Sequence, residues 1–165
     1  MELALDNIPF EVHELTAPDE RVRGLFQRSF NLPPPEEPRH FAAFYKAGGV
    51  ERVAGYVHYS VRYTDIFLCG GLCIDSRIYR LLSTAERKAI ADAGSLSRWL
   101  SVHSIAALGS KRAVFAFTGD SRSRRDAFAI GFVPTSDRFL LVQWHDAPES
   151  ERAALVARVA ALGPF

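Results

Sequence analysis

The segment 66–75 constrains the fold of this chain more than any other. It is apolar on both faces, which is typical of a central strand covered by helices on each side. Gly70 and Gly71 interrupt it, and paired glycines inside a strand indicate a β-bulge or a place where another backbone or a ligand approaches closely. We therefore expect this strand in the middle of a sheet, with a ligand-facing edge at the two glycines.

A helical region follows this strand and is interrupted at Gly94 and Ser95. The free amides at a helix N-terminus bind phosphate, so a helix that begins at Ser95 predicts a phosphate site near the end of the strand. A glycine between two helices is also the usual stop of the first one. Ser83 and Glu86 form a capping box for a first helix over 83–93, so both interpretations of Gly94 stay open.

Length and charge narrow the classes of protein. The 165 residues, 48% of them hydrophobic, suffice for one globular domain over 1–165. The 20 basic and 19 acidic side chains are spread along the chain, which argues against a partner such as extended nucleic acid. No apolar run approaches the roughly 20 residues of a membrane span, and residues 1–10 lack a signal-peptide pattern. We expect a cytoplasmic protein with no membrane partner.

Cys69 and Cys73 lie four residues apart in the same expected strand. They should point to one face about 13 Å apart, which is too far for a disulfide. No further His or Cys lies at ligand spacing, so we expect two reduced, buried cysteines and no metal site.

Hydrophobic periodicity predicts the other elements. Strands are expected over 10–15, 40–46, 52–63, 112–118 and 138–144, and helices over 20–30, 95–108, 121–130 and 150–162. Asp19, Asp120 and Ser150 are the expected N-caps. In the strand 52–63, Val53, Val57 and Tyr59 should share one face, with Tyr56 and His58 on the other. This order predicts an α/β fold with a mixed, mostly antiparallel central sheet flanked by helices.

The run Ala113-Val114-Phe115-Ala116-Phe117-Thr118, then a helix that ends in Ala129-Ile130-Gly131-Phe132, then a strand, resembles the C-terminal half of the GCN5-related N-acetyltransferase family. With the earlier strands, the order of elements is similar over about 10–144. The resemblance implies an acyl-coenzyme A N-acyltransferase-like fold. It also implies an acyl-coenzyme A-dependent N-acyltransferase, with acetyl-coenzyme A as co-substrate and an amine as acceptor.

The family places acyl-coenzyme A in a split between the central strand and the strand 112–118. The resemblance implies that strand groups of Leu72, Cys73 and Ile74 pair with the pantetheine arm. Amides at the next helix start would hold the pyrophosphate; here these belong to Gly94, Ser95, Leu96 and Ser97. Only Gly94 matches the glycine signature of the family in this region.

Arginines add a feature that is independent of the resemblance. Arg122 and Arg125 lie in the first turn of the helix capped by Asp120, where the helix dipole disfavours cations. A bound anion would offset this cost, and a solvated basic turn is the alternative. Arg77, Arg80, Arg87 and Lys88 form a second basic group.

Acetyl transfer needs a base for the ammonium and an acid for the leaving thiolate. In the family the acid is often a Tyr on the helix before the Gly-Phe pair; here Ala127 and Phe128 stand there. Ser121 and Tyr79 are the substitutes by location, and His58 and Asp75 are the candidate bases. A purely structural role is the alternative for each of these four residues.

Two rival hypotheses follow from these gaps. The first is a domain of the same fold that binds coenzyme A, or a protein, without catalysis. The second is a structural or regulatory homodimer that uses the strand 138–144 as an edge and the helix 150–162 as its interface.

Overall fold

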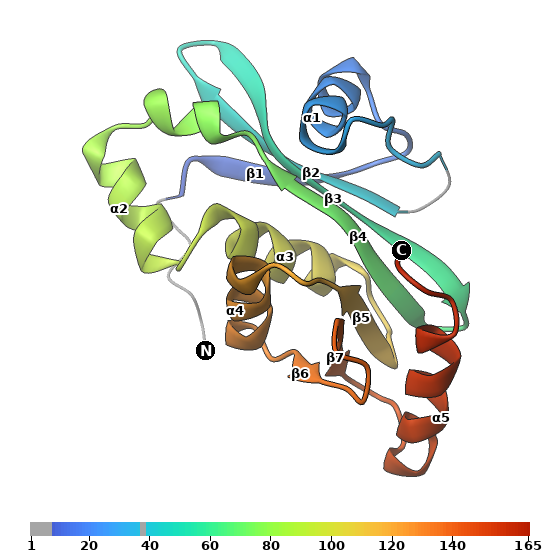
Figure 1. Cartoon of the computed structure of the whole chain (residues 1–165). Helices are drawn as coiled ribbons and strands as arrows, with labels where there is room; N and C mark the ends of the chain where they lie inside the picture. Colours follow the sequence, from blue (N-terminus) through green and yellow to red (C-terminus); the bar gives the residue numbers. More distant parts are fainter. Residues whose placement is uncertain (1–7, 37–38) are drawn as a thin grey trace.

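A computed structural model describes residues 8–36 and 39–165. In this part of the chain, seven strands form one sheet in the order β1-β2-β3-β4-β5-β7-β6 (Figure 1). Neighbouring strands are antiparallel, except β4 and β5, which are parallel. The strands are β1 (Phe10–Leu15), β2 (Arg39–Ala47), β3 (Val50–Tyr63), β4 (Ile66–Ile74), β5 (Ala113–Phe117), β6 (Val133–Pro134) and β7 (Leu140–Trp144). The predicted mixed, mostly antiparallel sheet is confirmed.

The helices follow the predicted order. They are α1 (Glu20–Phe30), a 3-10 helix η1 (Ser76–Arg80), α2 (Thr84–Asp92), α3 (Leu96–Ala107), α4 (Ser121–Ala129) and α5 (Glu149–Ala160). Side chains of Asp19 and Asp120 cap α1 and α4, and the capping box of Ser83 and Glu86 starts α2, as predicted. The expected cap at Ser150 is wrong, because α5 begins at Glu149 after Pro148 and has no side-chain cap.

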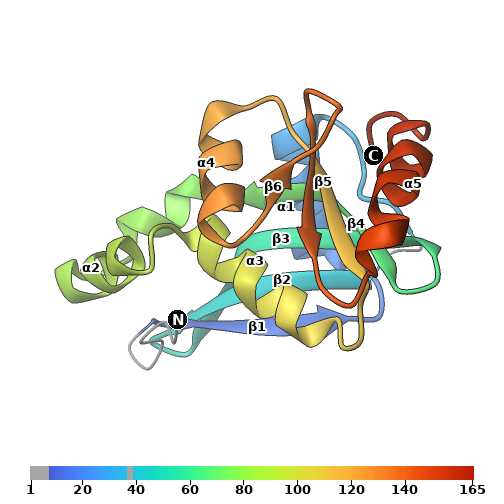
Figure 2. The same cartoon turned by 90° about the horizontal axis from the view of Figure 1, so that it is seen from below.

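Helices cover both faces of the sheet (Figure 2). On one face, α1 packs Val22, Leu25 and Phe26 against β2, β3 and β4, and α5 packs Leu155 and Val159 against β4, β5 and β7. On the other face, α3 packs Leu96, Trp99 and Leu100 against β2 to β5. The central strand β4 is therefore covered on both sides, which explains its apolar sequence.

The paired glycines of β4 form the predicted bulge. His58 of β3 pairs with Gly70 and Tyr56 pairs with Cys73, so Gly71 and Leu72 together oppose the single residue Val57. Gly71 has a φ of 60°, in the left-handed region that glycine adopts without steric cost. A bulge of this kind bends its strand and increases the local twist.

The bulge also reverses the alternation of side chains along β4. Cys69 packs on the face covered by α3, whereas Cys73 packs on the face covered by α1. The expectation that both cysteines point to one face is therefore wrong, because one extra residue lies between them. Both are free, as expected, and burial raises the pKa of Cys69 to about 12 and that of Cys73 to about 11.

A second irregularity lies between β2 and β3. Phe44 pairs with Val53 and Ala43 pairs with Gly55, so Ala54 is an extra residue. Val53 consequently packs with Tyr56 on the α1 face, while Val57 and Tyr59 face α3. The expectation that these three residues share a face is wrong for Val53.

The strand β7 lies inside the sheet. It pairs with β5 on one side and with β6 on the other. The expectation that residues 138–144 form an edge strand is wrong, because the two-residue strand β6 covers it. A dimer through that edge loses its structural basis.

We predict that Gly71→Ala destabilises the fold more than Gly109→Ala does. Both glycines have positive φ, but a Cβ at Gly71 would lie 2.5 Å from atoms of His58 and Phe26, whereas nothing lies within 4 Å of one at Gly109. Gly109→Ala should cost about 1–2 kcal/mol of unfolding free energy through the backbone alone. Steric overlap should add about 1–3 kcal/mol at Gly71. Urea denaturation measures both, and equal losses would contradict this packing.

Candidate functional site

The backbones of β4 and β5 separate part of the way along the sheet. Their pairing runs from Ile66 and Ala113 to Cys69 and Ala116 and stops there. Beyond this point β4 continues along β3, and β5 continues along β7. The β5-facing backbone groups of residues 70–74 therefore have no strand partner, and such groups need another hydrogen-bonding partner.

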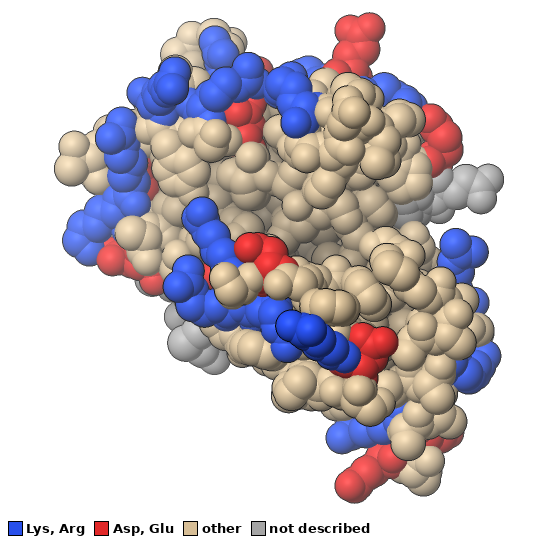
Figure 3. Space-filling view, in the orientation of Figure 1, with Lys and Arg blue, Asp and Glu red and all other residues tan. Residues whose placement is uncertain are grey.

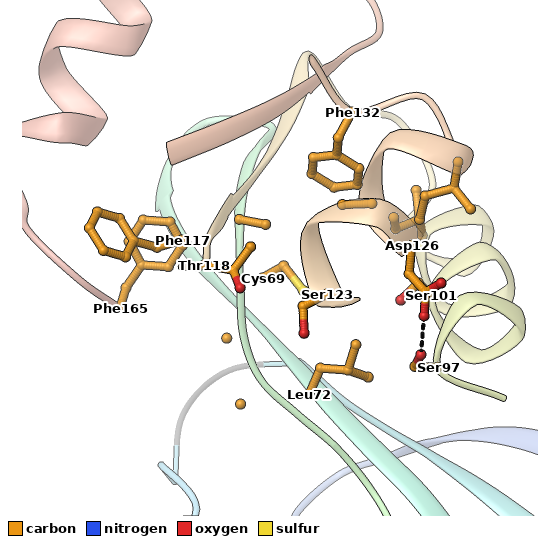
Figure 4. A pocket seen from close by; sticks show the side chains of 16 residues that line it. Cys69, Leu72, Ser97, Ser101, Phe117, Thr118, Ser123, Asp126, Phe132 and Phe165 are labelled. Atoms are coloured by element: carbon orange, nitrogen blue, oxygen red, sulfur yellow. Dashed lines mark hydrogen bonds between the residues drawn. The ribbon is translucent and has the colours of Figure 1, made fainter. Parts of the chain in front are cut away.

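A cavity of about 130 Å³ lies at this split (Figure 4). Figure 4 shows Phe117 and Phe165 at one end of it and Ser97, Ser101 and Asp126 at the other. The bulge supplies backbone to its wall, and α3 and α4 supply the side chains Ser97, Ser101, Ile105, Ser123, Asp126, Ala127 and Ile130. The cavity is thus apolar at one end and rich in hydroxyl groups at the other.

A second cavity of about 250 Å³ adjoins the first. It lies between the end of β4, the 3-10 helix and the N-termini of α3 and α4. Both cavities are lined by Leu72, Ser97, Ser123 and Asp126, so they share a wall. Arg122 lies in the wall of the second cavity.

Basic side chains flank a hollow on this face of the molecule. Figure 3 shows them over the 3-10 helix and α2 on one side and along α4 on the other. Among the described residues, neither Arg122 nor Arg125 takes part in an ion pair. The charge of Arg122, which lines the second cavity, is therefore free to attract an anion there.

Asp126 organises the N-terminus of α3. The hydroxyls of Ser95 and Ser97 each donate a hydrogen bond of 2.7 Å to its Oδ2, and the Arg98 guanidinium donates one of 3.3 Å to its Oδ1. Ser95 also caps α3 by accepting from the Arg98 amide at 3.0 Å. Burial alone would raise the pKa of Asp126, but these hydrogen bonds lower it, so a buried carboxylate stands here.

His58 lies behind the bulge on the α1 face and is 7% exposed. Its ring fills the space next to both glycines: a Cβ at Gly70 would lie 2.7 Å from its Nε2, and one at Gly71 would lie 2.8 Å from its Nδ1. Within the described part of the chain, its buried Nδ1 has no hydrogen-bond partner. Burial lowers the pKa of His58 to about 4, so the ring is neutral at neutral pH.

The structure brings together most of the residues that we expect to bind acyl-coenzyme A, the acyl donor. The second cavity is lined by Leu72, Cys73, Ile74, Ser95, Leu96, Ser97 and Arg122. Gly94 and Arg125 line neither cavity. Gly94 has a φ of 95° at the end of α2, so its conformation serves the stop of that helix.

The four candidate catalytic residues do not come together. Tyr79 lines the second cavity, His58 lies on the α1 face, and Ser121 is exposed outside both cavities. Asp75 caps the 3-10 helix and lies in a different cavity, beside α1. Arg77, at 2.7 Å, and Arg28, at 3.5 Å, pair with Asp75, and the hydrogen bond from Arg77 lowers its pKa.

Sequence reasoning missed Asp126, Ser123 and Thr118. Ser123, Asp126, Ala127 and Ile130 follow the spacing of one helical stripe, and this stripe of α4 lines the first cavity. A lone carboxylate on an inward stripe is a signal that could have pointed to Asp126. Thr118 follows β5 directly and offers no such pattern.

Comparisons with known proteins agree with this geometry. No protein-family model and no curated protein matches the sequence. Among solved structures, an acyl-CoA N-acyltransferase from Pseudomonas aeruginosa is 11% identical, with a TM-score of 0.52 over 81% of this chain and 97% of that one. An acetyltransferase from Streptococcus agalactiae is 14% identical, with a TM-score of 0.52 over 83% and 99%. Ard1 from Thermoplasma volcanium is 16% identical, with a TM-score of 0.51 over 86% and 100%.

The chain therefore has an acyl-CoA N-acyltransferase-like fold, which confirms the fold expected from the sequence. Within residues 8–36 and 39–165, no helix combines the length and apolar character that a membrane crossing needs. The same residues contain no cluster of three or more His, Cys, Asp and Glu that could hold a metal ion.

We predict that His58 makes the fold less stable in acid. Its pKa is about 4 in the folded state against 6.5 for the ordinary group, so the unfolded chain binds a proton first as the pH falls. The contribution of His58 to the free energy of unfolding is complete above pH 6.5. It should decrease by about 3 kcal/mol by pH 4. Denaturation of wild type and His58→Gln across this range measures the difference, and parallel pH profiles would contradict the burial of His58.

Proposed function

We propose that this protein is an acyl-coenzyme A-dependent N-acyltransferase that transfers an acetyl group to an amine. One observation supports this above the rest: pairing of β4 and β5 ends at Cys69 and Ala116, and a cavity lies where the strands part. The likeness of the fold to N-acyltransferases also supports this reaction. Because one fold can host many activities, the geometry of the site carries more weight than the fold.

The free backbone of β4 suits the pantetheine arm of the donor. This arm is a thin chain with two amide groups, and the unpaired backbone at Leu72, Cys73 and Ile74 can hydrogen-bond to it as a strand would. The cavity at the split would then receive the thioester. Arg122 in the second cavity and Arg125 nearby would attract the phosphates.

The reaction requires two proton movements. The amine nitrogen attacks the thioester carbonyl, a C–N bond forms and the C–S bond breaks; one proton leaves the amine and another reaches the thiolate. A neutral nitrogen of His58, beside the bulge on the α1 face, is our candidate for the first step.

Ser123 is our candidate for the second step. It lies one turn before Ala127, where the family often carries its Tyr, and it lines both cavities, which Ser121 does not. Its hydroxyl donates a hydrogen bond of 2.7 Å to Asp120 at the start of α4, so the hydroxyl must turn away from this carboxylate to protonate the thiolate.

A domain that binds coenzyme A without catalysis is the second candidate. The ion pairs of Asp75 and the exposed position of Ser121 favour it, because two expected catalytic groups are then absent from the site. Binding of coenzyme A with no turnover over a broad panel of amines would select this alternative.

We predict that acetyl-coenzyme A binds in the split and that Ala116→Phe abolishes this binding. The added ring would occupy the cavity at the point where the strands part. Ala47→Phe is the matched control, because Ala47 is an exposed alanine at the end of β2 and lines neither cavity. Isothermal titration calorimetry measures both variants. Absence of binding to the wild type at high micromolar concentration would refute the proposed function.

We also predict that Ser123→Ala lowers kcat by about 10²-fold, since loss of a general acid typically costs this much or more. Ser121→Ala should retain wild-type kcat, because Ser121 lies outside both cavities. Release of free thiol from acetyl-coenzyme A in the presence of an amine measures turnover. A larger loss of kcat in Ser121→Ala than in Ser123→Ala would support Ser121 as the acid and contradict the role of Ser123.

A further inference from the structure

A side chain of the protein itself occupies the N-terminus of α3. A helix of this length attracts an anion to its first turn, and the anion found there is the carboxylate of Asp126, which comes from α4. Asp126 is 8% exposed, so it belongs to the packed wall of the site. The inference below rests on the proposed function, because it concerns how the donor is held.

The contacts of Asp126 take up side-chain donors at the start of α3. Ser95 and Ser97 each have one hydroxyl proton, and both protons are donated to Asp126. The Arg98 guanidinium also points to this carboxylate. A phosphate at the same place would find backbone amides but no free serine hydroxyl, and it would lie beside a fixed negative charge.

The outer, exposed part of the second cavity has the reverse character. Arg122 lines it and forms no ion pair within the described part of the chain, and Figure 3 shows further basic side chains along α4. Negative charge is therefore disfavoured at α3 and favoured at the outer rim of the same cavity.

We propose that Asp126 is a specificity-determining residue that keeps the phosphates of the donor away from the N-terminus of α3. The donor is then held chiefly through its pantetheine arm in the split, and its phosphates lie at the rim near Arg122. Pantetheine carries the arm without the adenine nucleotide. Its loss of affinity relative to coenzyme A should therefore be smaller in this protein than in one whose helix N-terminus holds the phosphates.

Asp126→Asn tests this directly. The amide keeps the shape of the side chain and can still accept hydrogen bonds, but it removes the charge. Calorimetry at low salt should show coenzyme A binding about tenfold tighter to the variant, with the affinity for pantetheine unchanged. Glu149→Gln is the matched control, because it removes the same charge from an exposed position on α5 and should alter neither affinity.

Thermal unfolding verifies that the variant folds, and Asp126→Ser provides the same charge removal if the asparagine variant does not. Unchanged or weaker binding of coenzyme A relative to pantetheine in the folded variant would overturn the role of Asp126. Binding of neither compound to the wild type would instead refute the proposed function, so the two failures are distinguishable.

Discussion

The bulge at Gly71 is the constraint on which the rest of this site depends. It places two residues of β4 against one of β3, bends the strand, and pairing with β5 ends next to it, at Cys69. The rings of His58 and Phe26 occupy the space that a side chain at Gly71 would need, so packing and backbone conformation both require glycine. One local irregularity thus accompanies the cavity, the unpaired backbone of β4 and the burial of His58.

The two halves of the site differ in how they treat charge. At the split, the wall combines apolar side chains with backbone groups and hydroxyls, which suits an uncharged arm of a ligand. Towards α3, the carboxylate of Asp126 takes up the hydroxyls of Ser95 and Ser97. This internal anion agrees with the poor glycine signature around Gly94, since both point to weak phosphate contacts at this helix start.

Local patterns in the sequence predict the elements but not their register. The caps at Asp19, Ser83 and Asp120 and the bulge at the paired glycines follow from short-range rules. The opposite faces of Cys69 and Cys73 do not, because the alternation changes only once the pairing with β3 is known. The interior position of β7 depends on a two-residue strand too short to give a pattern, and the role of Asp126 depends on partners 28 to 31 residues away.

A nuclear magnetic resonance titration of the uniformly ¹⁵N-labelled chain with acetyl-coenzyme A tests the central claim most directly. If the split holds the donor, the amide resonances of residues 70–74 and those of Thr118 and Ser123 should shift together and saturate. The amide resonances of β1 and β2, which lie two or more strands away from the split between β4 and β5, should stay unchanged. Shifts confined to the cavity beside α1, or none at millimolar ligand, would contradict the account.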